Sequence, residues 1–287
     1  MIFASNIVYR NGLLEDGRMR YKLICIDMDG TLLDDKGKIS EENMEAIKKA
    51  YDKGIMIAIA TGRGVTSAEY HLGLIGVEGM IIALNGSYIK ERGSNIFIFK
   101  CPLTMSEVKN IYEVVERHDI KAYFNTIDTS ISNRKIVEEV INRYKGQGSK
   151  IQFCENIATL EKFNGEILKV SIINENNIEL FNRVKKELKD MEMFEVVDSN
   201  TDYVEIMKNG CSKGRAVKML AEIIGITRDE VVCIGDNEND IAMIEYAGLG
   251  IAMGNGCELL KKQADYITDT NFNSGVAKAI NKILSVF

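Results

Sequence analysis

Two aspartates stand close together directly after a short apolar run. Residues 23–26 are all apolar, and Asp27, Asp29, Gly30 and Thr31 follow them. Such a run predicts a strand buried on both faces of a parallel sheet, with Asp27 at its carboxyl end, where open α/β sheets bind ligands. Two carboxylates so close repel each other unless they share a cation or a proton, and with a third carboxylate they would suit Mg²⁺. The simpler alternative is a pair of ordinary turn residues.

A second polar turn follows another apolar run, residues 55–60, and begins with Thr61 and Gly62. Taken alone, Thr61 most simply caps the helix that comes next. The functional alternative is that its hydroxyl and the Gly62 N–H bind a phosphate oxygen. Because a strand, a helix and a strand in this order form a right-handed βαβ unit, we expect Asp27 and Thr61 on the same edge of one sheet.

Two further polar groups lie in the C-terminal third of the chain. Lys213 occupies the first turn of a helix that Ser212 can cap. The helix dipole disfavours a cation there, so Lys213 is either a chance surface lysine or a ligand for a phosphate docked at that helix end. A third apolar run, residues 231–234, leads to Asp236 and Asp240. These two predict a carboxylate cluster at the same edge of the sheet, unless they only cap a helix.

The elements that must position these residues predict an α/β fold. Buried strands alternate with amphipathic helices, which is typical of a doubly wound, Rossmann-like parallel sheet. Strands are expected at 23–26, 55–60, 80–84 and 231–234, with helices near 40–54 and 212–225.

The middle of the chain departs from this pattern. It begins with a hairpin and continues with strands paired with helices, one of them near 137–144, without fully buried runs. This predicts an inserted α+β domain at residues 88–205, within a core formed by 21–87 and 206–287. Residues 1–20 are expected to be an N-terminal tail.

The composition excludes several classes of protein. Hydrophobic residues make up 46% of the 287 residues and charged residues 27%, as in globular proteins. A net charge of −6 gives no support to nucleic-acid binding, and no apolar run is long enough to span a membrane. The six cysteines are scattered without a CxxC pair, and Cys25 and Cys233 lie in apolar runs as buried thiols, which favours a reducing cytoplasm.

The motifs together resemble a known family. IDMDGT, ATGR, the segment Ser212-Lys213-Gly214 and GDNENDIAM are similar in type and order to the motifs of the Cof-type branch of haloacid dehalogenase-like hydrolases. The resemblance extends from Tyr21 to Phe287. It implies a phosphatase with a Rossmann-like core and an α+β cap domain at the position of the insert.

The resemblance also implies a role for each aspartate. Asp27 is expected to attack the substrate phosphorus and form an aspartyl-phosphate. Asp29 is expected to protonate the leaving oxygen and then to deprotonate the water that hydrolyses this intermediate. Mg²⁺ would be held by Asp27, by the backbone carbonyl of Asp29 and by Asp236.

The remaining motif residues would bind the phosphoryl group. The resemblance implies contacts to its oxygens from the Met28 N–H, Thr61, Gly62, Lys213 and Asn239. Asp240 is expected to orient Lys213. The physical reason is charge, because an anionic nucleophile approaches an anionic phosphoryl group only when nearby cations offset their repulsion.

Two alternatives remain open at this point. One is a phosphomutase or phosphotransferase of the same superfamily, and the other is a non-catalytic phosphate-binding regulatory protein. The intact motifs argue against the second, since a binder needs neither a nucleophile nor an acid/base. The expected partner is a small phosphorylated metabolite, with a sugar phosphate, a pyridoxal-type phosphate and a flavin precursor phosphate all open. The sequence does not indicate the oligomeric state.

Overall fold

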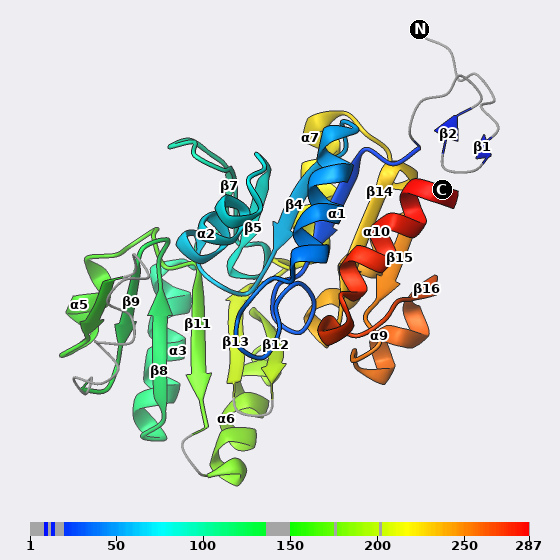
Figure 1. Ribbon diagram of the computed structural model, residues 1–287. Helices are drawn as coiled ribbons and strands as arrows, with labels where there is room; N and C mark the ends of the chain where they lie inside the picture. The colour runs from blue at the N-terminus through cyan, green and yellow to red at the C-terminus, as the bar shows by residue number, and fades with distance from the viewer. Residues whose placement is uncertain are drawn as a thin grey trace, which may run out of the picture. The chain divides into compact units, whose positions relative to one another are not determined.

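A computed structural model gives the structure of the chain (Figure 1). It describes residues 9–10, 13–14, 20–135, 150–174, 177–200 and 203–286. The short strands β1 (Tyr9–Arg10) and β2 (Leu13–Leu14) pair antiparallel. The rest of the predicted N-terminal tail before Arg20, and the helix predicted near 137–144, lie outside the described residues.

The described residues form two compact units. The first unit consists of the described parts of residues 1–60, 72–80 and 217–287, and the second of those of residues 61–71 and 81–216. Two helices, α2 (Val65–Ile75) and α7 (Lys213–Ile224), have residues in both units. The domain boundaries expected at residues 88 and 205 stay a prediction.

A parallel sheet forms the centre of the first unit. Its strands run in the order β16-β15-β14-β3-β4, each parallel to its neighbours. They are β3 (Leu23–Ile26), β4 (Met56–Ala60), β14 (Val231–Gly235), β15 (Leu249–Ala252) and β16 (Tyr266–Ile267). Every residue of β3 and β14 is buried, as their apolar runs predicted. The carboxyl ends of these neighbouring strands therefore meet at one edge.

Helices cover this sheet. They are α1 (Glu41–Asp52), α8 (Ile241–Tyr246), α9 (Glu258–Gln263) and α10 (Gly275–Val286), with 3₁₀ turns η2 (Arg228–Glu230), η3 (Glu238–Asp240) and η4 (Asn271–Asn273). As predicted, Ser40 caps α1, since its side chain accepts a hydrogen bond from the Asn43 amide. Helices α1 and α10 lie side by side (Figure 1).

After residues 61–71, the second unit continues with a strand and a hairpin. Strand β5 (Met80–Ala83) leads into a 3₁₀ turn, η1 (Leu84–Gly86), and then into the predicted hairpin of β6 (Tyr88–Glu91) and β7 (Phe97–Lys100). Leu84 and Asn85 both have positive φ, at 52° and 54°. The chain therefore turns sharply at this point.

A mixed six-stranded sheet follows, in the order β10-β9-β8-β11-β13-β12. Its strands are β8 (Lys121–Asn125), β9 (Thr129–Ser132), β10 (Lys150–Phe153), β11 (Lys169–Ile173), β12 (Phe194–Asn200) and β13 (Tyr203–Lys208). The helices are α3 (Met105–Arg117), α5 (Ile157–Glu161) and α6 (Ile178–Asp190). Strands β9 and β10 and helix α5 were not predicted from the sequence.

One hydrophobic core holds the six-stranded sheet and its helices together. Residues of α3 and α6 pack with inward-facing residues of the strands: Val108, Ile111, Val115, Phe181, Val184, Phe124 and Ile172. The helices therefore cover one face of this sheet. The predicted capping box starts α3, with Thr104 and Glu107 bonding each other's backbone amides.

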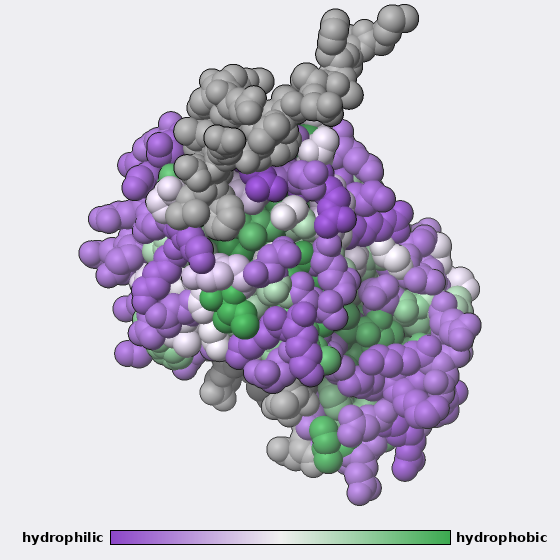
Figure 2. Space-filling view, turned by 90° about the vertical axis from the view of Figure 1, so that its right-hand side faces the viewer, coloured by the Kyte–Doolittle hydropathy of each residue, from purple (hydrophilic) through white to green (hydrophobic). Residues whose placement is uncertain are grey.

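Hydrophilic side chains cover most of the surface face in view (Figure 2). Figure 2 shows one face of the molecule, on which hydrophilic residues predominate and hydrophobic residues form separate patches. No helix in the described part of the chain is both long and apolar enough to cross a membrane. The predicted fold class, α/β with a Rossmann-like parallel-sheet core, is confirmed.

Candidate functional site

Asp27 is the first residue after β3, and its side chain is almost fully buried at 5% exposure. Its amide donates to the carbonyl of Ile234 at 3.0 Å, which continues the pairing of β3 with β14 beyond the last strand residue. A carboxylate is thereby held at the carboxyl edge of the parallel sheet, where ligands bind in folds of this class.

Asp236 is the first residue after β14, the neighbouring strand. The hydroxyl of Thr31 donates to Asp236 Oδ1 at 2.7 Å. Gly30 lies against the same carboxylate, since a Cβ on Gly30 would stand 2.3 Å from Asp236 Oδ2. The Gly-Thr pair that follows Asp29 therefore packs around the carboxylate of Asp236.

Asp240 is completely buried and holds the turn that contains Asp236. Its Oδ2 accepts hydrogen bonds from the amides of Asp236 at 3.0 Å and Asn237 at 3.1 Å. It belongs to η3, the 3₁₀ turn that precedes α8. Asp240 thus fixes the backbone of Asp236, while its expected effect on Lys213 stays a prediction.

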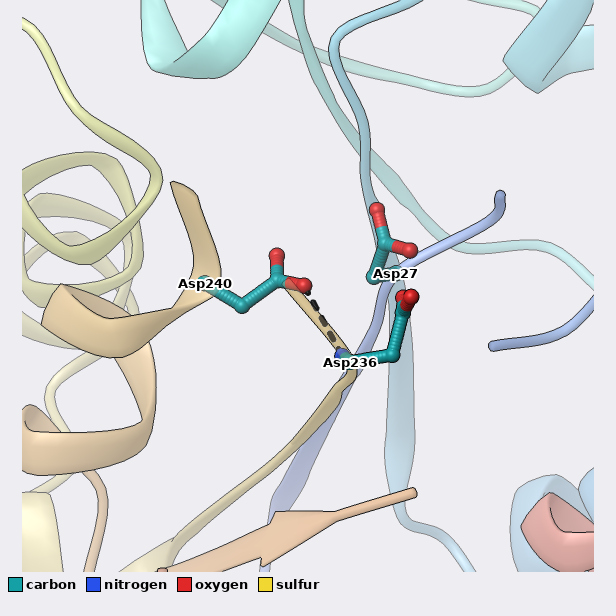
Figure 3. Close-up of side chains that lie close together, drawn as sticks. All are labelled: Asp27, Asp236 and Asp240. Atoms are coloured by element: carbon teal, nitrogen blue, oxygen red, sulfur yellow. Dashed lines mark hydrogen bonds between the residues drawn. The ribbon is translucent and has the colours of Figure 1, made fainter. Parts of the chain in front are cut away.

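Three carboxylates gather at this edge. Asp27, Asp236 and Asp240 each offer an oxygen, and these oxygens lie within 4.8 Å of one another. The carboxylates of Asp27 and Asp236 lie side by side, while Asp240 reaches the Asp236 amide (Figure 3). Clustered carboxylates repel unless a cation or protons intervene. Hard, anionic oxygens are the donors that divalent cations such as Mg²⁺ or Ca²⁺ prefer, so the group fits a divalent metal ion.

Met28 and Asp29 separate Asp27 from the Gly30 turn. The carbonyl of Met28 accepts from the amides of Thr31 at 3.3 Å and Leu33 at 2.9 Å. Met28 is buried and Asp29 is exposed. An exposed carboxyl can exchange protons with water or with a ligand, which suits the acid/base role expected of Asp29.

Thr61 and Gly62 follow β4 directly and belong to the second unit. Thr61 is buried, and its Oγ1 accepts the Arg63 amide at 3.1 Å. Its own amide donates to the carbonyl of Ile82 at 2.8 Å. The first of these bonds shapes the polar turn, and the second holds it against β5.

Lys213 is the first residue of α7 and is 1% exposed. Burial removes the ammonium from water, and the helix dipole disfavours a positive charge at a helix N-terminus, so both effects raise the free energy of a cation here. Because Lys213 is buried, a chance surface lysine is ruled out. The backbone at Gly86 packs closely against Ser212, the residue before this helix. A Cβ on Gly86 would lie 2.3 Å from the carbonyl oxygen of Ser212. Gly86 also has a φ of +93°, which favours glycine.

The predicted site residues divide between the two units. Asp27, Met28, Asp29, Asp236, Asp240 and the half-buried Asn239 belong to the first unit, and Thr61, Gly62 and Lys213 to the second. The grouping of Asp27 with Asp236 and Asp240 comes from the structure, whereas binding of phosphoryl oxygens by the other residues stays a prediction.

The sequence did not indicate three buried polar residues of the second unit, Asn85, Lys169 and Glu205. Lys169 forms an ion pair with Glu205, and the side-chain Nδ2 of Asn85 donates to Glu205 Oε2 at 2.5 Å. The available signal was weak. It consisted of a lysine and a glutamate within apolar strand segments and an Asn-Gly pair after a buried strand.

Comparison with known families gives a match over most of the chain. A family model described as haloacid dehalogenase-like hydrolase matches residues 24–280. All four motifs singled out above fall inside this range. The matched range also includes Asn85, Lys169 and Glu205.

Individual relatives agree with this match. A 5-amino-6-(5-phospho-D-ribitylamino)uracil phosphatase of Bacillus subtilis is 36% identical over 90% of this chain and 94% of its own length. A second Bacillus subtilis protein of the same name is 31% identical over 92% of this chain and 98% of its own length. A solved haloacid dehalogenase-like hydrolase from Bacteroides thetaiotaomicron superimposes with a TM-score of 0.80 at 30% identity, covering 92% of this chain and 99% of that one.

Proposed function

The chain belongs to the haloacid dehalogenase-like hydrolases, which act on phosphate esters, and on this premise we propose that it is a Mg²⁺-dependent phosphatase of a small phosphorylated metabolite. The observation that carries the proposal is the group of Asp27, Asp236 and Asp240 at the carboxyl edge of the parallel sheet. A phosphate-binding protein without catalysis needs no carboxylate nucleophile at this edge.

In the proposed reaction, Asp27 is the nucleophile. One of its carboxylate oxygens attacks phosphorus, and the bond from phosphorus to the ester oxygen breaks, which leaves an aspartyl-phosphate. Asp29 gives its proton to the departing ester oxygen. In the second half, Asp29 takes a proton from water as the water oxygen attacks phosphorus, the bond from phosphorus to the Asp27 oxygen breaks, and inorganic phosphate leaves. Both aspartates thereby return to their starting states.

The proposed metal ligands are Asp27, Asp236 and the backbone carbonyl of Asp29. When bound, Mg²⁺ supplies positive charge that offsets the repulsion between the Asp27 carboxylate and the phosphoryl group. Asp240 supports this arrangement through the backbone amides of Asp236 and Asn237.

The proposed ligands of the phosphoryl oxygens all donate hydrogen bonds. The set is the Met28 amide, the Thr61 hydroxyl, the Gly62 amide, the Lys213 ammonium and the Asn239 side chain. The burial of Lys213 supports its place in this set, because a buried ammonium gains most from an anionic ligand. Asp240 is proposed to orient Lys213.

The names of the relatives suggest the first substrate to test. Two of them are named 5-amino-6-(5-phospho-D-ribitylamino)uracil phosphatases, so we include this flavin precursor beside sugar phosphates and a pyridoxal-type phosphate. Residues 88–205 are proposed to be the cap that recognises the part of the substrate beyond the phosphoryl group. The described cysteines are all free, which supports a cytoplasmic location.

The test is release of inorganic phosphate by the purified chain with Mg²⁺. The panel contains these metabolites and an aryl phosphate, with and without added sugar acceptors. Phosphate release without an acceptor supports hydrolysis, whereas transfer only to an acceptor sugar would establish the phosphotransferase alternative. A folded protein that binds phosphate but turns over none of these esters would establish the non-catalytic alternative.

A further inference from the structure

A buried ion pair lies inside the second unit. Lys169 begins β11 and Glu205 lies in β13, which pairs antiparallel with β11 so that Ser171 faces Glu205. The side chains of Lys169 and Glu205 are only 7% and 10% exposed. Because residues two apart share a face of a strand, Lys169 and Glu205 extend from the same face of the sheet and meet there.

Lys169 does more than neutralise Glu205. Its Nζ also donates to the carbonyl oxygen of Gly62 at 2.7 Å. The side-chain Nδ2 of Asn85 donates to Glu205 Oε2 at 2.5 Å, so the second oxygen of Glu205 is held as well. The ammonium is therefore fixed between one carboxylate and one backbone carbonyl.

The Gly62 carbonyl belongs to the same peptide unit as the Arg63 amide. That amide donates to Thr61 Oγ1 at 3.1 Å, so both ends of one rigid peptide plane are held. Because Thr61 Oγ1 accepts there, its hydroxyl hydrogen remains available for an acceptor. The orientation of this peptide thus helps to set where the Thr61 hydroxyl points. The Gly62 amide belongs to the preceding peptide, whose Thr61 carbonyl accepts from the backbone amide of Asn85 at 3.0 Å.

Close packing makes the arrangement specific for glycine. A Cβ on Gly62 would lie 2.9 Å from Glu205 Oε2 and 3.1 Å from Asn85 Oδ1. The backbone is tied to the same place, since the backbone amide of Asn85 donates to the Thr61 carbonyl at 3.0 Å. The loop is thus held by side chains from two strands more than 100 residues later in the chain.

Stability alone does not explain this pair. Taking two charges out of water costs much of what their attraction gains, and an apolar pair of similar volume is often as stable. An apolar pair could not donate a hydrogen bond to the Gly62 carbonyl, as the ammonium of Lys169 does. The geometry therefore points to a role at Thr61 and Gly62.

We propose that Lys169 is a positioning residue that orients the Thr61–Arg63 loop for phosphoryl binding, and that Glu205 and Asn85 hold its ammonium in place. The inference rests on the proposed function, in which Thr61 and Gly62 bind phosphoryl oxygens. Lys169 acts through the Gly62 carbonyl and need not touch the substrate.

The test compares three variants by kcat, KM and inhibition by inorganic phosphate. Partners that orient ligand-binding groups typically cost 10–100-fold when removed, so we expect Lys169→Met to lower kcat/KM roughly 10–100-fold and to weaken phosphate inhibition by a similar factor. Lys185→Met is the control, because Lys185 also pairs with a carboxylate, Asp198 at 2.5 Å, in the same unit. It should leave both constants near those of the original protein.

The double variant Lys169→Met/Glu205→Gln separates positioning from charge balance. It removes both buried charges, so it should fold even if Lys169→Met does not. A positioning role predicts that its kcat/KM and phosphate inhibition stay impaired. Recovery of both constants in the double variant would overturn the inference and leave Lys169 as a partner of Glu205 only.

Direct binding of inorganic phosphate, measured by calorimetry, keeps the two proposals distinguishable. If the original protein hydrolyses no ester but binds phosphate, the proposed function fails, and weaker binding by the double variant still supports positioning by Lys169. If the original protein is active and all variants match it, the inference alone fails. If the original protein neither hydrolyses esters nor binds phosphate, both fail.

Discussion

The carboxylate of Asp236 lies directly against Gly30, in the space that a Cβ of residue 30 would fill. A Cβ there would stand 2.3 Å from Asp236 Oδ2 and 3.1 Å from Oδ1. Gly30 also has a φ of +79°, a conformation that other residues rarely adopt. One glycine therefore meets two independent requirements, a turn of the backbone and room for a proposed metal ligand.

Gly30→Ala should impair catalysis more than its backbone strain explains. The left-handed conformation costs about 1–2 kcal/mol for a residue with a Cβ. Gly37→Ala is a matched control, because Gly37 has a φ of +70° and nothing within 4 Å of its Cβ position. In thermal unfolding Gly30→Ala should lose at least as much stability as Gly37→Ala, because its Cβ must also displace the Asp236 carboxylate. Only Gly30→Ala should raise the Mg²⁺ concentration that gives half-maximal activity, and equal Mg²⁺ requirements would contradict the assignment of Asp236.

Asp27→Asn should nearly abolish turnover while the protein stays folded. The substitution keeps the shape of the side chain but removes the nucleophilic charge and one proposed metal ligand. Loss of a nucleophile typically costs about four orders of magnitude or more in kcat. Phosphate release from an aryl phosphate gives the rate, and circular dichroism with thermal unfolding shows that the fold is kept. Near-normal turnover by the folded variant would exclude the aspartyl-phosphate mechanism.

Asp236→Asn should weaken metal binding and should not slow the chemical step once the metal is bound. Its activity should therefore recover in part as Mg²⁺ is raised, whereas that of Asp27→Asn should not. Chelation with EDTA should silence the original protein. Ca²⁺ should inhibit it, because its longer and less regular coordination misplaces the phosphoryl group. Full activity after exhaustive chelation would show that the carboxylate group has no metal to hold.

Much of the core could be predicted because its signals are local. Strands β3 and β14 are unbroken apolar runs, and Asp27 and Asp236 mark the points where these runs end. Strands β9 and β10 escaped prediction for the opposite reason. Thr129–Ser132 is mostly polar, and Lys150–Phe153 is a largely exposed edge strand, so neither shows the buried run or clean alternation of a core strand.

The contacts of Lys169 and Glu205 could not be predicted, because they depend on pairing between distant segments. Glu205 lies between the buried residues Val204 and Ile206, where alternation predicts that its side chain faces solvent. The burial of Glu205 is explained only by the pairing of β13 with β11, which brings the opposite charge of Lys169 beside it. Likewise, nothing local indicates that Gly30 makes room for Asp236.

Cys101 should react with alkylating reagents at a lower pH than an ordinary thiol. A hydrogen bond from Cys211 lowers the pKa of Cys101 to about 7, with help from the positive charges of Lys208 and Arg215. The thiolate is the reactive form, so the alkylation rate should rise with pH through a midpoint near 7. Peptide mass spectrometry after treatment with iodoacetamide would measure it. Cys211→Ala removes the donor and should move the midpoint upward, and an unchanged midpoint would rule out this hydrogen bond as the cause.

Asp29→Asn should separate the two halves of the proposed reaction, because its effect depends on the leaving group. An alkyl ester leaves as a strongly basic alkoxide and needs a proton from Asp29, whereas nitrophenolate leaves without one. With an alkyl phosphate, the variant should therefore fail already at the first step. With nitrophenyl phosphate, Asp27 should still be phosphorylated, and the second step should slow because water has lost its base.

The measurement for Asp29→Asn is a rapid burst of nitrophenolate followed by slow turnover, since an accumulating covalent intermediate gives burst kinetics. The amount of nitrophenolate released in the burst should equal the amount of enzyme. Hydroxylamine should release the phosphate from Asp27. Asp27→Asn is the control, because it should give no burst with any ester. If Asp29→Asn slows both esters equally and shows no burst, Asp29 is not the acid/base. The exposed Asp29 would then contribute through its backbone, between Asp27 and Gly30, and not through its carboxyl group.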